Sequence, residues 1–201
     1  MDVYLASGNP HKLEEFLTIV HKERLPVRMF GAGAAGGMPE VEENGSTFEA
    51  NARIKAEALL GKVPEGAWVL ADDSGLIVDA LDGAPGVHSA RFAGPGGNAT
   101  ANNIKLIQAM KGLPEGKRTA RFSCVLYFVK AGAEGLVFKG TCEGHIMPAP
   151  SGRFGFGYDP LFRPLGYRRT FADLPSSIKN NLSHRGRATA GWAAHVRSMG
   201  S

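Results

Sequence analysis

Residues 67–76 read "AWVLADDSGL", an apolar run followed by two adjacent acids. The five apolar residues 67–71 are typical of a buried β-strand, which would carry Asp72 and Asp73 at its carboxyl end. Like charges repel, so an apolar strand would be more stable without this pair, and we interpret the acids as functional. The alternative is an Asx turn that closes the strand, a role that needs only one of the two.

The segments before this strand predict another strand and two helices. Residues 3–7 form a short apolar stretch that predicts a buried strand, and Asn9 can cap a helix directly after it. Ser46 and Glu49 have the spacing of a capping box, so a second helix is expected to begin there. Gly61 is expected to end that helix.

The segments after the strand complete an α/β pattern. A helix is predicted over 100–111, and two alternating stretches, 119–130 and 135–146, predict the strands of a hairpin. A last helix is expected to start near Ser183. This order of elements predicts an α/β fold with a mixed sheet, in a single domain over residues 1–201.

The composition is that of a folded protein with many tight loops, since 27 of the 201 residues are glycine. The net charge of +4 suits an anionic ligand, although it does not distinguish a nucleotide from a nucleic acid. We expect no signal peptide and no membrane-spanning segment, and therefore a cytoplasmic protein. Cys124 and Cys142 lack a metal-binding spacing and are predicted to be reduced and buried.

The stretch "SGNPHK", residues 7–12, lies between the first predicted strand and helix. A turn of this kind directs free backbone N–H groups and the positive end of the helix at one point, which suits phosphate. Ser7, Asn9 and Lys12 add side-chain donors. The spacing is not that of a Walker A loop, and the alternative is a capped helix start without a ligand.

Acidic residues gather in two stretches of the chain. Glu40, Glu42 and Glu43 precede the second helix, and Asp72 and Asp73 follow the strand. Oxygen ligands in this number suit Mg²⁺, which proteins hold with one or two carboxylates and the phosphates of a substrate. A cation would also relieve the repulsion between the adjacent acids. The alternative for the glutamates is a solvated acidic loop.

Two further stretches carry aromatic and basic residues. In "GRFGFGYDP", residues 152–160, aromatic rings alternate with glycines, which suits stacking on a planar base; the alternative is that these rings belong to the core. In "SHRGRA", residues 183–188, His184 and Arg185 stand at a helix start, where the alternative is a serine cap with solvated basic residues. Ser74 lacks the G-x-S-x-G context of a hydrolase nucleophile.

Phosphate donors, carboxylates, a stacking loop and a basic helix start together indicate a nucleotide site. In the same stretches the sequence resembles the inosine/xanthosine triphosphate pyrophosphatase family, the Ham1-like pyrophosphatases of non-standard purine nucleotides. The motifs follow the family's order along nearly the whole chain: "ASGNPHKLEEF", "ENGSTFEANARIKAEAL", "ADDSGLIVDALDGAPGVHSARFAG", "GRFGFGYDPLF" and "LSHRGRA". The resemblance implies a long central mixed sheet flanked by helices, two lobes with an active-site cleft between them, and a homodimer.

The resemblance also implies an activity, the Mg²⁺-dependent hydrolysis of ITP, dITP and XTP to the monophosphate and pyrophosphate, which cleanses the nucleotide pool. It implies Asp73 as the catalytic proton acceptor and Glu42 with Asp73 as the metal ligands. For substrate binding it implies Ser7, Gly8, Asn9, Pro10, His11 and Lys12 at the triphosphate, Ser74, and Phe156, Gly157, Tyr158, Asp159, Lys179, His184 and Arg185 at the base. His11 and the segment that carries Lys179 depart from the usual family pattern.

Our hypothesis is that Asp73, with Glu42 and Mg²⁺, orients or deprotonates a water that attacks the α-phosphorus, while Asp72 supports them or a second metal ion. Arg185 is only a donor and would favour 6-oxo bases over adenine. The expected partner is a nucleoside triphosphate, not a nucleic acid or a membrane. Two alternatives stay open, a pyrophosphatase of modified pyrimidine or other non-standard nucleotides, and a nucleotide- or nucleic-acid-binding module without turnover. The acids argue against the module, because carboxylates at a phosphate site require a cation.

Overall fold

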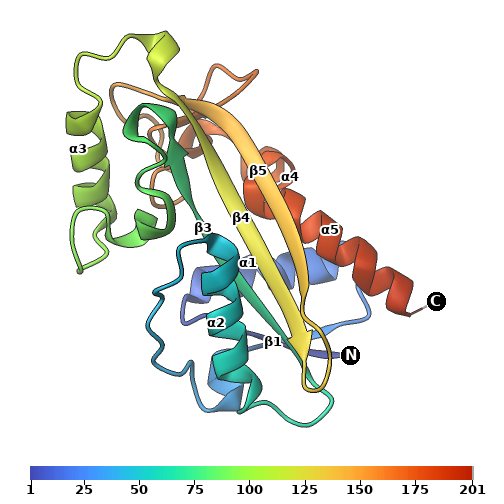
Figure 1. Cartoon of the computed structure of the whole chain (residues 1–201). Coiled ribbons are helices and arrows are strands. Elements are labelled where there is room, and N and C mark those ends of the chain that lie inside the picture. The colour runs from blue at the N-terminus through green and yellow to red at the C-terminus, as the bar shows by residue number, and fades with distance from the viewer. Residues whose placement is uncertain (201) are drawn as a thin grey trace. The chain divides into compact units, whose positions relative to one another are not determined.

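The computed structural model describes residues 1–200, and its helices and strands are shown in Figure 1. In chain order they are β1 (Asp2–Leu5), α1 (Pro10–Lys22), β2 (Arg28–Gly31), α2 (Phe48–Leu60), β3 (Trp68–Val78), α3 (Ala99–Ala109), β4 (Thr119–Lys130), β5 (Leu136–Ile146), β6 (Phe162–Pro164), α4 (Ser176–Leu182) and α5 (His184–Met199). Short 3₁₀-helices lie in several of the connections between them.

The strands form one sheet of six in the order β2-β1-β3-β4-β5-β6. Strand β1 runs parallel to both β2 and β3, whereas β5 and β6 are antiparallel, so the sheet is mixed. Figure 1 shows β4 and β5 as long neighbouring strands. The predicted α/β fold with a long mixed sheet flanked by helices is confirmed.

The chain forms two compact units, and the long strands contribute to both. The first unit comprises Met1–Asp73, Val125–Lys139 and the chain from Ala188 onward; the second comprises Ser74–Cys124 and Gly140–Arg187. Two lobes were expected from the resemblance. The single domain over the whole chain and the active-site cleft stay predictions.

In the first unit the sheet is covered on both faces. On one face Trp68 of β3 stacks on Phe128 of β4 with ring centroids 4.3 Å apart. Trp192 of α5 meets Phe128 and Phe16 of α1 edge-on, at 6.0 and 6.2 Å. Helices α1 and α5 therefore cover this face, with large aromatic side chains as the contact.

The opposite face of the first unit's sheet is covered by α2. Ala52, Ala56 and Leu59 of this helix belong to one buried cluster with Val69 and Ala71 of β3. The small alanine side chains let the helix approach the strand closely. Because successive strand residues point to opposite faces, β3 presents its odd-numbered residues to α2 and its even-numbered ones to α1 and α5.

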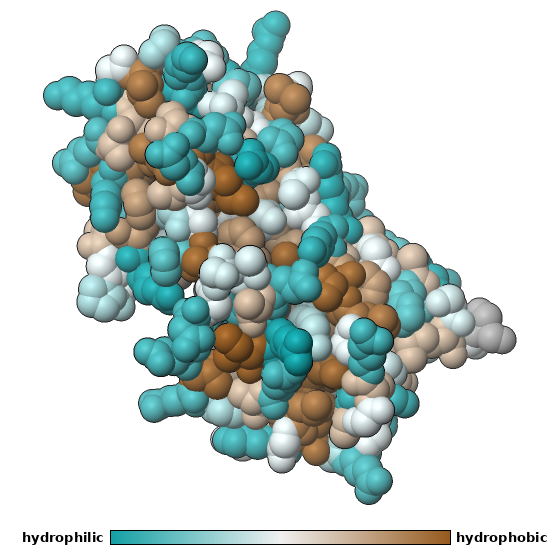
Figure 2. Space-filling model, viewed as in Figure 1, coloured by the Kyte–Doolittle hydropathy of each residue, from teal (hydrophilic) through white to brown (hydrophobic). Residues whose placement is uncertain are grey.

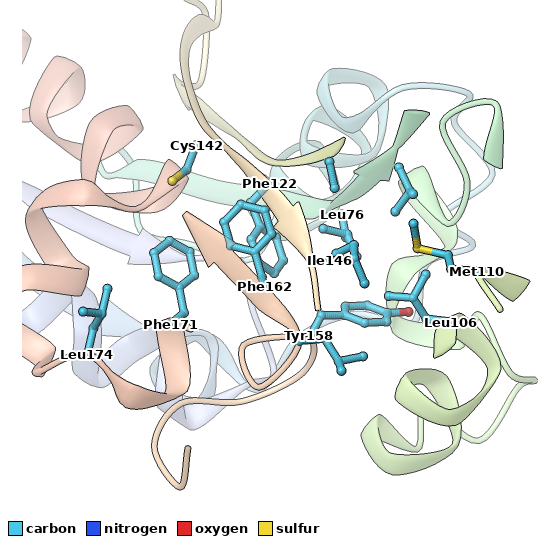
Figure 3. Packing of buried hydrophobic residues seen from close by; sticks show 13 residues of the cluster. Leu76, Leu106, Met110, Phe122, Cys142, Ile146, Tyr158, Phe162, Phe171 and Leu174 are labelled. Carbon is cyan, nitrogen blue, oxygen red and sulfur yellow. The ribbon is translucent and has the colours of Figure 1, made fainter. Parts of the chain in front are cut away.

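In the second unit strand β5 is buried mainly on one face. Gly140, Cys142 and Gly144 are buried, whereas Thr141 and Glu143 between them are exposed. This alternation is typical of a sheet with one solvated face. The buried face carries a cluster whose members come from β3, α3, β4, β5, β6 and the segments before and after β6 (Figure 3).

Two local predictions are wrong, and two short elements were not predicted. Strand β3 does not end at Ala71 but continues through both acids to Val78. The cap of α2 is Thr47, whose side chain accepts a hydrogen bond from the Ala50 amide at 3.1 Å, rather than Ser46. The short elements β2 and α4 were not predicted, since neither has enough residues to show a period.

The cysteine prediction is confirmed, because Cys124 and Cys142 are both free and buried. Figure 2 shows apolar and polar residues mixed in small patches on the face in view. Within residues 1–200, no helix has the length and apolar character needed to cross a membrane.

Candidate active site

The adjacent acids of β3 occupy opposite faces of the sheet, and each has a lysine of its own. Lys12 of α1 donates to the Asp72 carboxylate at 2.6 Å, and Lys55 of α2 donates to the Asp73 carboxylate at 2.7 Å. Asp72 and Asp73 are only 1% and 8% exposed. Their repulsion is relieved by the pleat of the strand and by two separate ion pairs, which lets β3 continue through them.

Lys55 is one of two residues of this cluster that the sequence interpretation missed. Its ammonium lies between the Asp73 carboxylate and the Glu43 carboxylate, the latter at 3.2 Å, and the residue is 8% exposed. Burial lowers the pKa of Lys55, but the nearby carboxylates of Asp73, Asp72 and Glu43 raise it more, so its pKa lies above the ordinary value and the group stays charged.

Burial has the opposite consequence for Asp73. Loss of hydration raises the pKa of its carboxyl group, and the partly compensating attraction of Lys55 does not bring it back to the ordinary value. A carboxylate with a raised pKa accepts a proton more readily than a solvated one. Asp73 therefore has the character of a general base.

Asn51, one turn before Lys55 on α2, also contacts Asp73. Its amide oxygen accepts a hydrogen bond from the Gly45 N–H at 2.8 Å, which directs its NH₂ group toward the second Asp73 oxygen, 3.4 Å away. A Cβ at Gly45 would lie 2.6 Å from the Asn51 oxygen, so the close approach requires glycine. Two polar residues four apart on an otherwise apolar face were the available sequence signal.

The predicted phosphate segment is where the sequence placed it, at the amino terminus of α1. Asn9 caps the helix by accepting from the His11 N–H at 3.0 Å, and Pro10 is the first helical residue. Gly8 to His11 are exposed, and the His11 imidazole has a solvent-exposed contact of 3.8 Å with Glu14. Lys12 is the member of this segment that points toward β3.

The acidic loop before α2 places its two glutamates differently. Glu43 contacts Lys55, whereas the side chain of Glu42 is exposed. No three His, Cys, Asp or Glu side chains within residues 1–200 are arranged to hold a metal ion by themselves. Asp73 and Glu43, which share one lysine, offer the one or two carboxylates that Mg²⁺ takes when phosphates complete its shell.

In the second unit, Asp159 stabilises the glycine-rich stretch of residues 152–160, called here the aromatic–glycine loop. Its carboxylate accepts from the Phe156 N–H at 2.8 Å and from Lys179 at 2.6 Å. Gly155 lies directly against this carboxylate, with a φ of +80°, and a Cβ there would overlap it. The loop conformation therefore depends on glycine at this position.

Phe156 has an exposed ring with two cations beside it. The ring is 46% exposed, Lys179 Nζ lies 5.1 Å from its centroid, and Arg185 Cζ lies 5.7 Å from it. Arg185 is buried and also donates to the Ser74 hydroxyl at 3.2 Å. Phe156, Lys179, Arg185, Ser74 and Asp159 are thus brought together, and the arrangement offers a flat apolar face edged with donors.

Tyr158 and His184, also predicted at the base, lie in the interior of the second unit. The Tyr158 ring belongs to the buried cluster with Leu106 of α3 (Figure 3), and its hydroxyl donates to the Ser89 carbonyl at 2.8 Å. Burial raises the pKa of this hydroxyl well above its ordinary range. The His184 ring stacks on Phe122 with centroids 4.7 Å apart. Both side chains contribute packing beneath the loop.

A sequence model of the Ham1 family matches residues 3–195. The chain belongs to the Ham1 family. The family includes proteins of known structure that resemble this one closely: the Ham1 protein of Staphylococcus aureus has a TM-score of 0.88 and 36% identity, over 99% of this chain and 100% of that one. A HAM1 protein from Coxiella burnetii has a TM-score of 0.89 and 35% identity, over 98% and 99%.

Relatives named as dITP/XTP pyrophosphatases also match this chain. The dITP/XTP pyrophosphatase of Opitutus terrae is 46% identical over 197 residues, which make up 96% of each chain. That of Desulforamulus reducens is 45% identical over 188 residues, which cover 94% of this chain and 92% of that relative. The Ham1 resemblance inferred from the motifs is confirmed over nearly the full length.

Proposed function

We propose that this Ham1 protein is a nucleoside triphosphate pyrophosphatase that converts non-standard purine nucleotides, ITP, dITP and XTP, to the monophosphate and pyrophosphate. The observation that carries the proposal is the buried Asp73 carboxylate, held by Lys55 and raised in pKa. The full-length similarity to dITP/XTP pyrophosphatases supports the same reaction. Asp73 and Ser74 are consecutive residues of β3.

In the proposed reaction Asp73 orients a water molecule and accepts its proton. The water oxygen bonds to the α-phosphorus, the bond from that phosphorus to the bridging oxygen breaks, and pyrophosphate leaves. Lys55 holds the Asp73 carboxylate in place through their 2.7 Å contact. The positive charge of Lys55 also stabilises the negative charge that develops as the phosphate reacts.

The phosphates are assigned to the amino terminus of α1 and to Lys12. The exposed segment Gly8–His11 leaves backbone groups and the positive end of the helix accessible to an anion. The side chain of Asp72 is fully buried, and its carboxylate holds the Lys12 ammonium beside this segment through their 2.6 Å contact. In this proposal Asp72 acts through Lys12 and not on the water.

The carboxylate set fits Mg²⁺, with Asp73 and a glutamate of the acidic loop, Glu42 or Glu43, as its protein ligands. When bound, Mg²⁺ supplies positive charge that stabilises the phosphates and lowers the pKa of a coordinated water. Lys55 already bridges Asp73 and Glu43, which brings those two carboxylates to one place.

The base is assigned to the loop around Phe156. Its exposed ring offers a stacking face, and Arg185 and Lys179 beside it can only donate hydrogen bonds. Hypoxanthine and xanthine present an acceptor at O6, whereas adenine presents a donor there. A donor edge therefore favours the 6-oxo bases, because adenine would leave polar groups unpaired.

The test is to incubate the protein with ITP, XTP, ATP or GTP, with Mg²⁺ or with EDTA, and to measure pyrophosphate and monophosphate together. We expect equal amounts of both products from ITP and XTP, only with Mg²⁺, and little turnover of ATP. Guanine also carries an acceptor at O6, so turnover of GTP tests for selectivity at the 2-position of the base. Equal turnover of all four nucleotides would support the proposed pyrophosphatase reaction but contradict the assignment of base recognition to the Phe156 loop. No turnover under any condition would contradict the proposed function.

From the same family resemblance we propose a homodimer that acts in the cytoplasm. Light scattering on the purified protein tests the first point, since a dimer has twice the mass of the 21.3 kDa chain. Cell fractionation tests the second.

A further inference from the structure

Helix α3 carries two adjacent asparagines that bind the backbone of two different segments. Asn102 is buried, and its amide oxygen accepts from the Ala93 N–H at 2.6 Å. Its NH₂ group donates to the carbonyls of Ala90 and Ser89 at 3.0 and 3.3 Å. One side chain thus satisfies three backbone groups of the segment after β3.

Asn103 points to the aromatic–glycine loop. Its NH₂ group donates to the Gly157 carbonyl at 3.0 Å, and since a carbonyl can only accept, the orientation of the amide is fixed. The amide oxygen of Asn103 is then buried without a hydrogen-bond partner within residues 1–200. A buried unpaired acceptor is unfavourable, so packing alone does not explain an asparagine here, whereas its donor does.

The two asparagine contacts are joined into one closed network. The Ser89 carbonyl that accepts from Asn102 also accepts from the Tyr158 hydroxyl at 2.8 Å, and Tyr158 directly follows Gly157. The Ser89 hydroxyl accepts from the Leu76 N–H of β3 at 2.9 Å and donates to the Gly86 carbonyl at 2.6 Å. Helix α3, the segment after β3 and the loop therefore hold one another through backbone groups.

The loop depends on such external contacts because glycine gives it little preference of its own. Gly155 and Gly157 have φ values of +80° and +60°, which only glycine adopts readily. Between them, the Phe156 ring makes its contacts with Lys179 and Arg185 and is otherwise exposed. The backbone on the two sides of this ring is held by Asp159 and by Asn103.

We propose that Asn103 is a positioning residue for base recognition, which fixes the Phe156 ring by holding the Gly157 carbonyl, with Asn102 anchoring the other end of the network. The inference rests on the proposed function, because it assumes that Phe156 contacts the base. It assigns a role in specificity to a side chain of α3 that acts through the Gly157 carbonyl.

The test compares Asn103→Leu, which keeps the size but removes the donor, with Gln108→Leu on the exposed side of the same helix. Because Leu also removes the unpaired oxygen, we expect the melting temperature of Asn103→Leu to stay close to wild type. We expect its KM for ITP to rise about 10-fold with kcat within about twofold, and its preference for ITP over ATP to fall. Gln108→Leu should leave all of these unchanged.

Hydrogen exchange of residues 154–158 gives a readout that needs no activity. In Asn103→Leu this segment should exchange faster, while residues 89–93, held by Asn102, should keep wild-type protection. Unchanged exchange and unchanged KM would overturn the proposal, as would a loss of kcat in proportion to a lower melting temperature. Asn103→Ala repeats the test without added bulk. If wild type does not hydrolyse ITP, the proposed function fails, and the exchange result still decides whether Asn103 holds the loop.

Discussion

The two units hold their candidate functional residues in different ways. In the first unit, Asp72 and Asp73 lie within a central strand and pair with lysines of two helices, so the charged groups are fixed by regular elements. In the second unit, Phe156 lies on a glycine-rich loop that hydrogen bonds from Asp159 and Asn103 hold in shape. In the first unit, regular secondary structure positions the charged side chains. In the second unit, side-chain hydrogen bonds determine the conformation of the loop.

This difference separates the expected effects of substitution. Side chains on packed helices and strands keep their positions closely, which suits a reaction that needs an oriented water. A loop whose conformation comes from a few hydrogen bonds can be changed without loss of the core. Substitutions in the first unit should therefore lower kcat or stability, whereas those in the loop should raise KM and relax selectivity.

The largest effect is expected for Asp73→Asn. The amide keeps the size of the side chain but cannot take a proton from water, so kcat should fall by about 10²–10⁴-fold. The fold should persist, because no volume is lost in the buried strand and Lys55 keeps its contact with the Glu43 carboxylate. Pyrophosphate release and a thermal melt measure the two quantities, and near-normal turnover would remove Asp73 from the reaction.

Lys55→Met tests whether the buried ion pair contributes more to the free energy of unfolding than a surface ion pair does. It leaves Asp73 and Glu43 without their shared cation, and we expect a loss of about 3–5 kcal/mol in the free energy of unfolding. Lys139→Met is the matched control, because Lys139 pairs with Glu49 at 2.7 Å on the surface of the same unit. That change should cost about 0.2–1 kcal/mol. Urea denaturation measures both, and similar losses would contradict the distinction.

Phe156→Ala tests whether a substitution in the aromatic–glycine loop raises KM and leaves kcat nearly unchanged. Stacking of a base on an aromatic ring contributes about 1–3 kcal/mol, so the KM for ITP should rise about 10-fold or more with little change in kcat. Phe154→Ala is the control, since that ring is 70% exposed and has no ring contact within residues 1–200. Steady-state kinetics on both variants decide the point. A matching rise in KM for Phe154→Ala would show that the loop recognises the base as a whole and not through Phe156.

The smallest effect concerns Cys142, on the buried face of β5. Burial raises the pKa of this thiol from 9.0 to about 11. Between these values the thiol loses its proton in the unfolded chain but not in the folded one, so the free energy of unfolding should fall as the pH rises. Urea denaturation across this range should show a smaller fall in Cys142→Ala. An identical fall in both proteins would mean that water reaches this face of the second unit.

Local patterns predicted most elements of the fold. The Asn9 cap, the end of α2 at Gly61 and the β4–β5 hairpin follow from interactions between residues close in sequence. The extent of β3 was missed because an apolar run was expected to end at a charged pair. The roles of Lys55 and Asn51 were missed because a polar residue on a helix gives no sign of its partner when that partner lies on a strand.

The sequence by itself determined most of the elements, the family motifs and the adjacency of the two acids Asp72 and Asp73. Only the tertiary structure decided that Asp72 belongs with Lys12 and Asp73 with Lys55, and that Tyr158 is a buried anchor of its loop. The physical reason is that alternation along a strand sends neighbouring residues to opposite faces. Which helix covers each face depends on contacts between residues far apart in the chain.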